Sequence, residues 1–165
     1  MAGKLSRYLV EDHRRLDSLL ERAISDRASA DAPAYTQFRS GLLKHIAMEE
    51  KILLPAAQRL NGGKPLGMAS ELRLDHGALA ALLVPTPTAP ILATIGAILK
   101  IHNSKEEGVN GVYKQCENLA EAEADQILHE LQNAPEVRVA ANFDGPEVTK
   151  AINRSLAKVG YTANV

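Results

Sequence analysis

The sequence predicts an all-α protein: an up-and-down antiparallel four-helix bundle followed by a C-terminal helical extension. Three observations predict this class. Apolar residues recur at helical rather than alternating spacing, alanine and leucine dominate the apolar positions, and a two-helix pattern occurs twice along the chain. We expect the bundle to occupy residues 1–133 and the extension, with one short helix packed on the bundle or trailing from it, to occupy residues 134–165.

The first two helices are predicted by their apolar faces and by the residues that begin, interrupt and end them. Asp31 is the expected cap of the second helix, with Pro33 in its first turn. Pro55 should kink this helix because its ring removes one backbone donor, and residues 61–63 (Asn-Gly-Gly) should end it. The apolar faces are Leu5, Leu9, Leu16, Leu20 and Ile24 in the first helix and Phe38, Leu42, Ile46, Leu53 and Ala56 in the second.

The next two helices come from an uncharged stretch of the sequence. Residues 77–99 carry no charged side chain, but the segment 85–90 (Pro-Thr-Pro-Thr-Ala-Pro) divides them into halves too short to span a membrane. We therefore expect two buried helices of a soluble protein. The third helix should run over about 66–84, and the fourth should open at Pro90 with Thr88 as its cap.

The chain after the fourth helix has weaker helical signals. Gly108 and Gly111 weaken the far end of that helix. The stretch Leu119–Gln132 is rich in alanine and glutamate, which predicts a fifth helix, and residues 146–159 predict one short terminal helix.

The composition of the sequence argues against several classes of function. The net charge is −1 with both signs well mixed, so we expect no nucleic-acid partner. Cys116 is the only cysteine, which excludes an intramolecular disulfide and a thiolate-rich metal site, and we expect it to be a small buried residue. The N-terminal segment has no apolar core long enough for a secretory signal. These features predict a cytoplasmic protein without a membrane segment.

An internal repeat is the strongest observation. The segments DHRRLDSLL (Asp12–Leu20) and DHGALAALL (Asp75–Leu83) share the pattern D-H-x-x-L-x-x-L-L. The segments HIAMEE (His45–Glu50) and HNSKEE (His102–Glu107) share H-x-x-x-E-E. Each half of the chain thus presents a lone histidine and then a histidine with a glutamate four residues later. Two helical hairpins related by approximate two-fold symmetry would bring these residues together near the symmetry axis.

The repeated residues have the chemistry of a metal site. Residues four apart lie on one face of a helix, and their phase matches the apolar faces, so these side chains should point inward. Two carboxylates buried without a counter-charge would be costly, and cations would supply the missing charge. Imidazole with carboxylate, without thiolate, suits iron, manganese or zinc. The candidate ligands are His13, His45, Glu49, His76, His102 and Glu106.

The order H…H-x-x-x-E…H…H-x-x-x-E in a helical chain resembles the hemerythrin-like proteins, or HHE cation-binding domains. The resemblance covers about Lys4 to Glu107 and extends into the following helix. It implies a four-helix bundle that holds two iron ions, bridged by the carboxylates and by an oxide or hydroxide, with manganese or zinc as possible substitutes. It also implies that the six candidates are the metal ligands.

Two departures from the family's oxygen carriers bear on function. Those proteins have a further histidine one turn before the third-helix ligand, where Leu72 stands here, and H-x-x-x-x-D in the fourth helix, where this chain has H-x-x-x-E. The resemblance therefore implies a centre that binds or reacts with dioxygen, nitric oxide or hydrogen peroxide rather than a simple carrier. Catalysis is left open; an enzyme here would be oxidase-, peroxidase- or catalase-like. The alternative is a non-catalytic module for sensing metal, oxygen or redox state, or for buffering iron.

Residues beside the candidate ligands are expected to play smaller parts. Asp12 and Asp75 project about 100° away from their histidines, which favours surface placement over capping, pairing with arginines or supporting a ligand on a neighbouring helix. Glu50 and Glu107 also face away and are not expected to be ligands, and His129 should face solvent. The sequence does not decide which tyrosine lies near the site: Tyr8, Tyr35 or Tyr113.

Overall fold

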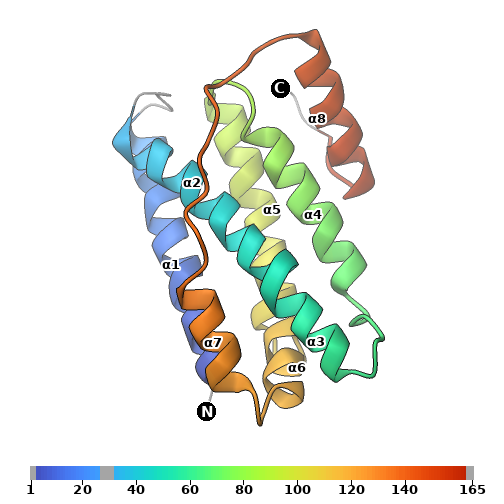
Figure 1. The fold of residues 1–165 in the computed structure, drawn as a ribbon. Helices are drawn as coiled ribbons and strands as arrows, with labels where there is room; N and C mark the ends of the chain where they lie inside the picture. Colours follow the sequence, from blue (N-terminus) through green and yellow to red (C-terminus); the bar gives the residue numbers. More distant parts are fainter. Residues whose placement is uncertain (1–2, 27–31, 163–165) are drawn as a thin grey trace.

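A computed structural model describes residues 3–26 and 32–162, and every regular element in these two ranges is a helix (Figure 1). The all-α class is therefore confirmed for this part of the chain. Asp31, the predicted cap of the second helix, lies outside it. The elements are α1 (Lys4–Ser25), α2 (Pro33–Met48), the π-helix η1 (Glu49–Leu53), α3 (Leu54–Leu60), α4 (Ala69–Leu82), α5 (Ala89–Glu107), α6 (Val112–Leu119), α7 (Ala124–Gln132) and α8 (Pro146–Lys158).

The longest helices lie side by side as rods in Figure 1: α1, α2 with its continuation into α3, α4, and α5. Each rod runs in the opposite direction to the one before it along the chain. α1 packs against α2 and α5, and α4 packs against α5 and α8. The shorter α6 and α7 lie at the same end of the rods as the N-terminus. This arrangement brings the middle sections of the long helices close together.

The apolar core consists of two clusters, one toward each end of the rods. The first includes Leu16, Leu20, Phe38, Leu42, Leu79, Leu82, Ile95 and Leu99, and the second includes Leu5, Leu9, Met48, Leu53, Leu72, Tyr113, Ile127 and Leu131. The long helices pass from one cluster to the other, and the repeated histidines fall between them. For example, His13 lies between the Leu9 and Leu16 positions of α1. A polar layer therefore divides the core.

The second predicted helix changes its hydrogen-bonding pattern over η1. The backbone N–H of Leu54 donates to the carbonyl of Glu49, five residues earlier. The next residue, Pro55, has no N–H and cannot donate the bond that an α-helix needs there. A π-helical turn thus lies directly before Pro55, where the sequence predicts a kink, and such turns are often found at functional sites. This turn begins at Glu49.

The third and fourth helices differ little from the prediction. α4 begins at Ala69 rather than Leu66. α5 begins as expected, because Thr88 Oγ1 accepts a hydrogen bond of 3.3 Å from the N–H of Ile91 and Pro90 lies in the first turn. In the described ranges, no helix combines the length and the apolar character that crossing a membrane requires.

The predicted fifth helix over Leu119–Gln132 is wrong in extent, because a turn at 120–123 separates α6 from α7. Gly108 and Gly111 do not simply weaken the end of α5; they form a tight turn that leads into α6. A Cβ atom on Gly111 would lie 2.3 Å from the Glu106 carbonyl oxygen, so this close approach requires glycine. α6 is not predicted from the sequence, because two glycines close together are also typical of the fraying end of a helix.

The C-terminal segment packs against the first core cluster. α8 matches the predicted terminal helix closely and buries Ile152 and Leu156. The preceding segment, residues 134–145, is tied to α2, where Arg39 Nη1 donates to the Ala140 carbonyl at 2.6 Å. The division of the chain into bundle and extension stays a prediction.

Candidate metal centre

The six residues that the repeat singles out lie together between the two core clusters. Each is at most 3% exposed, although all are ionisable. They form two overlapping groups, and within each group the potential ligand atoms all lie within 4.8 Å of one another. The groups are His13, His45, Glu49 and Glu106, and His76, His102, Glu49 and Glu106. Each group has its own pair of histidines, and both groups share the two glutamates.

The two shared glutamates face both histidine pairs with different oxygen atoms. Glu49 Oε1 lies 3.3 Å from His45 Nε2, and Glu49 Oε2 lies 3.1 Å from His76 Nε2. Glu106 spans the other two histidines in the same way, at 3.4 and 3.2 Å. Each carboxylate therefore extends from one histidine pair to the other, as a ligand that bridges two cations would.

A carboxylate outside the cluster holds each histidine in place. The pairs are Asp12 with His45 (2.8 Å), Glu50 with His76 (2.8 Å), Asp75 with His102 (3.2 Å) and Glu107 with His13 (2.7 Å). In each pair the carboxylate faces Nδ1, which favours the tautomer in which Nδ1 carries the proton and donates. The lone pair of each Nε2 then points into the cluster, where it is available to a metal.

The expected surface placement of Asp12 and Asp75 is wrong. Asp75 is 5% exposed, and the side chain of Asp12 is 16% exposed. A residue next to a cluster histidine projects about 100° around the helix, and in this packing that direction leads to the histidine of a neighbouring helix. Glu50 and Glu107 contact histidines for the same reason, and neither belongs to the two groups above. Two of the alternative roles therefore occur: both aspartates contact a histidine on a neighbouring helix, and Asp12 also pairs with an arginine.

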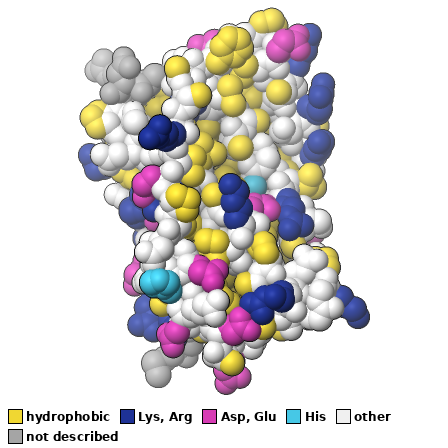
Figure 2. Space-filling view, viewed as in Figure 1, with side chains coloured by type: hydrophobic (Ala, Val, Ile, Leu, Met, Phe, Trp, Pro, Cys, Tyr) yellow, Lys and Arg dark blue, Asp and Glu magenta, His cyan; other side chains and the backbone are white. Residues whose placement is uncertain are grey.

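Each outer carboxylate is in turn paired with a basic side chain. The pairs are Arg15 with Asp12 (2.7 Å), Arg73 with Glu50 (3.0 Å), Lys105 with Asp75 (2.9 Å) and Arg14 with Glu107 (2.6 Å). Burial alone would raise the pKa of Asp12, but hydrogen bonds from His45 and Arg15 lower it. The pKa of Asp75 is lowered as well, against the effect of burial, by hydrogen bonds from His102 and Lys105, so Asp12 and Asp75 stay ionised. Figure 2 shows basic and acidic side chains interspersed over the face that it draws.

The cluster contains polar atoms that the protein itself leaves unsatisfied. Glu49 Oε2 and Glu106 Oε1 are buried and have no hydrogen-bond partner. The two Nε2 atoms within each histidine pair are 3.0 and 3.2 Å apart, and facing lone pairs at this distance repel unless a positive charge lies between them. Two nitrogens bound at right angles to one ion, at about 2.1 Å each, would lie about 3.0 Å apart. The donor set therefore fits a pair of cations.

In the metal-free protein, protons bound to histidines supply the positive charge that metal ions would otherwise bring to the cluster. Burial alone would lower the pKa of His45, but the nearby Glu49 carboxylate raises it to about 10. Burial would also lower the pKa of His102, but the hydrogen bonds with Asp75 and Glu106 raise it to about 9. A metal that binds here must displace these protons.

Tyr113, on α6, is the tyrosine that lies at the cluster. Its hydroxyl donates to Glu49 Oε1, and the phenol oxygen lies 3.0 Å from His13 Nε2 and 3.2 Å from Glu106 Oε2. Burial, followed by the charges of the two carboxylates, raises the pKa of Tyr113 well above its usual range, so the hydroxyl keeps its proton. The phenol also contacts His45, so it lies beside one histidine pair and makes the two halves of the cluster unequal.

The other tyrosines, the fifth histidine and the cysteine do not belong to either group of potential ligands. Tyr35 is buried in the first core cluster, and Tyr8 packs against the second. His129 is exposed, as predicted. Cys116 is buried, as predicted, and burial, reinforced by the cluster carboxylates, raises the pKa of its thiol to about 12.

The turn at Gly111 gives a first testable prediction. Gly111→Ala should lower the free energy of unfolding by about 1–3 kcal/mol, because the added Cβ must displace the Glu106 carbonyl. Gly77→Ala is the matched control, since Gly77 lies in α4 with nothing within 4 Å of an added Cβ, and it should be neutral or stabilise by up to about 1 kcal/mol. Urea denaturation of both variants measures the difference. Equal stabilities would show that the turn tolerates a side chain.

The fold and the cluster together define an α-helical cation-binding domain with two histidine pairs joined by two carboxylates. The family model of the hemerythrin HHE cation-binding domain matches residues 4–116, more than half of the chain, and the protein belongs to this family. No curated protein and no solved structure matched the chain. The matched range includes the six cluster residues and Tyr113, whereas α7 and α8 follow it.

Proposed function

We propose that this protein is a non-haem diiron protein that binds or reacts with a small oxidant: dioxygen, nitric oxide or hydrogen peroxide. The observation that carries the proposal is the pair of shared glutamates, each of which faces both histidine pairs with separate oxygen atoms. In this proposal the long helices act as an up-and-down antiparallel four-helix bundle. The six cluster residues are the metal ligands.

The number of donors supports a reactive centre. Two imidazoles and one oxygen from each glutamate give four protein donors per ion, fewer than the six that octahedral iron takes. Positions are therefore left for an exchangeable ligand. Manganese or zinc would accept the same donors, but bound iron would supply both Lewis-acid and one-electron redox chemistry.

The surrounding residues have definable roles in this proposal. The outer carboxylates fix the imidazole planes and keep Nε2 free for the metal. Leucine side chains of both core clusters limit the access of water. Tyr113 holds a proton on its phenol oxygen beside the His13 and His45 pair.

A small cavity beside the cluster supports a small ligand. It has a volume of about 10 Å³ and borders His13, His45 and His102, with Leu42 and Leu79 among the apolar residues that line it. A space of this size admits about one water-sized molecule. This favours a diatomic gas or a peroxide over an organic substrate.

Metal analysis and spectroscopy test the proposed function. Protein purified without a chelating tag should contain two iron ions per chain and should show a near-ultraviolet charge-transfer band that changes on addition of peroxide. His102→Ala should lose this band and most of the iron while it keeps its helical circular dichroism. His129→Ala is the matched control, because His129 is exposed and lies outside both groups, and it should behave as the unmodified protein. An iron-loaded protein with no such band would contradict the proposal.

A further inference from the structure

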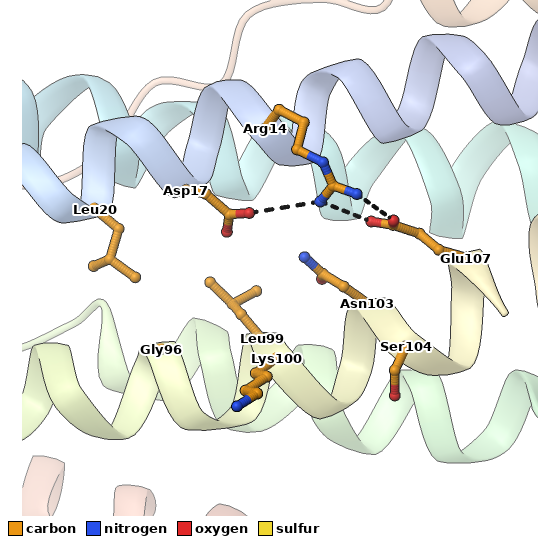
Figure 3. Close-up of a pocket in the computed structure, with 9 residues that line it drawn as sticks. All are labelled: Arg14, Asp17, Leu20, Gly96, Leu99, Lys100, Asn103, Ser104 and Glu107. Carbon is orange, nitrogen blue, oxygen red and sulfur yellow. Dashed lines mark hydrogen bonds and ion pairs between the residues drawn. The ribbon is translucent and has the colours of Figure 1, made fainter.

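A cleft of about 340 Å³ lies between α1 and α5 on the surface of the molecule (Figure 3). Leu20 of α1 and Gly96 and Leu99 of α5 are among the residues that line it. Gly96 has no side chain to fill the space, so the cleft stays open at this position. One wall of the cleft is α5, the helix that carries His102.

The cleft and the small cavity at the cluster share three lining residues: Asp17, Leu99 and Asn103. The cavity in turn borders the cluster histidines. The side chains of these three residues are therefore the barrier between the surface cleft and the cluster.

Asn103 is a polar group without a partner in this barrier. Its Oδ1 atom is buried and has no hydrogen-bond partner. Figure 3 shows the side chain pointing into the space between α1 and α5, next to Leu99. A buried amide oxygen left unpaired is unfavourable, and a molecule that donates a hydrogen bond at this point would satisfy it.

The charged residues that line the cleft are two basic and two acidic ones: Arg14, Lys100, Asp17 and Glu107. Arg14 binds Glu107 with an Nη2–Oε2 distance of 2.6 Å and lies 3.7 Å from Asp17, as the dashed lines in Figure 3 show. These groups therefore give the cleft no strong attraction for anions. Such an opening suits an uncharged molecule.

We propose that this cleft is the access route by which a small uncharged molecule reaches the metal centre, and that Asn103 makes the route selective for molecules that can donate a hydrogen bond. Hydrogen peroxide has this property, whereas nitric oxide and dioxygen do not. The inference rests on the proposed function, since it needs a metal centre that such molecules reach.

A substitution at Gly96 tests the route itself. A Cβ atom there would lie 3.7 Å from Leu20 Cδ2, an ordinary contact, so Gly96→Leu should fill the cleft without a backbone clash. The position is six residues, or roughly 9 Å along the helix, from His102. In stopped-flow mixing of the iron-loaded protein with nitric oxide or peroxide, both rates should fall by about tenfold or more, equivalent to about 1.4 kcal/mol of added barrier. Final absorbance and iron content should not change.

Gly77→Leu is the control for this variant. Gly77 lies in a helix next to a cluster histidine, as close to the site in sequence as any glycine, but it is exposed and outside the cleft. Its rates should equal those of the unmodified protein. Unchanged rates in Gly96→Leu would overturn the proposed route.

A substitution at Asn103 tests selectivity. Asn103→Leu keeps a similar volume but removes the acceptor oxygen. The rate with peroxide should fall about fivefold more than the rate with nitric oxide, the effect of losing about one hydrogen bond. Equal changes in the two rates would show that Asn103 does not select.

A readout that does not use iron separates the route from the proposed function. In the zinc-loaded protein, dissolved dioxygen should enhance the relaxation of the Leu16 and Leu79 methyl protons, which line the inner cavity, and Gly96→Leu should weaken this effect. No weakening would overturn the route. If the effect weakens but the unmodified iron-loaded protein does not respond to nitric oxide or peroxide, the route stands and the proposed function fails.

Discussion

Replacing Glu49 with glutamine is expected to release both metal ions from the protein. Glu49 faces both histidine pairs, so in the proposed diiron centre the loss of its charge would remove an anionic donor from each ion at once. We expect the affinity for metal to fall by more than about 100-fold, the upper end of the effect of removing an outer hydrogen-bonding partner. Elemental analysis after gel filtration, together with a competition titration against a chelator, measures this change.

The fold should survive the Glu49→Gln substitution. Without the carboxylate, the pKa of His45 loses the largest effect that raises it, and the imidazole keeps its hydrogen bond with Asp12, so no buried cation is left unpaired. Glu21→Gln is the matched control, because Glu21 is exposed on α1 and belongs to neither ligand group. A Glu49→Gln protein that keeps two ions per chain would show that this glutamate is not a ligand.

Metal uptake is expected to release about two protons at pH 7 and to strengthen steeply as pH rises. Without metal, the pKa values of His45 and His102 are raised to about 10 and about 9, so both imidazoles are protonated at neutral pH. A metal binds only neutral imidazole, so the apparent affinity should rise about tenfold per pH unit for each of these protons and level off above about pH 10. Calorimetric titrations in buffers of different ionisation enthalpy count the protons. A pH-independent affinity without proton release would contradict this ligand set.

The same histidines, together with Glu49, also determine how the stability of the metal-free protein depends on pH. The pKa values of His45 and His102 are raised, so their contribution to stability is fully present below about pH 6.5 and is lost as pH rises through 9 to 10. Burial alone would raise the pKa of Glu49, but the charge and hydrogen bond of His45, followed by the contact with His76, hold it well below 4.5, so its contribution is lost as pH falls below about that value. The metal-free protein should therefore be most stable at about pH 5–6.5, a range that thermal unfolding would locate.

The sequence predicts the inner residues of the cluster because they repeat. His13 and His76 in one motif, and His45 and His102 in the other, occur at positions whose helical phase matches the apolar faces. This phase depends only on helix geometry, so it can be read without knowing how the helices pack. The same reasoning predicts the all-α class.

The outer residues could not be predicted because their roles depend on packing between helices. Asp75 contacts a histidine on α5, and helical phase alone does not tell whether the direction in which it points holds solvent or another helix. Tyr113 lies outside the repeat, on a helix that begins after the Gly111 turn. One signal was present: the D-H and E-E pairs repeat together with the candidate ligands, so a shared role for Asp12, Glu50, Asp75 and Glu107 could have been inferred.

The packing of α8 against α4 has a thermodynamic consequence. Ile152 and Leu156 of α8 are buried against the same helix that carries His76. If an ion bound to His76 steadies α4, it also makes detachment of the tail less favourable. By reciprocity, a detached tail would then weaken the binding of the ion by the same factor. Binding of the ion and docking of the C-terminal helix would in that case be thermodynamically coupled, so a measurement of either would report on the other.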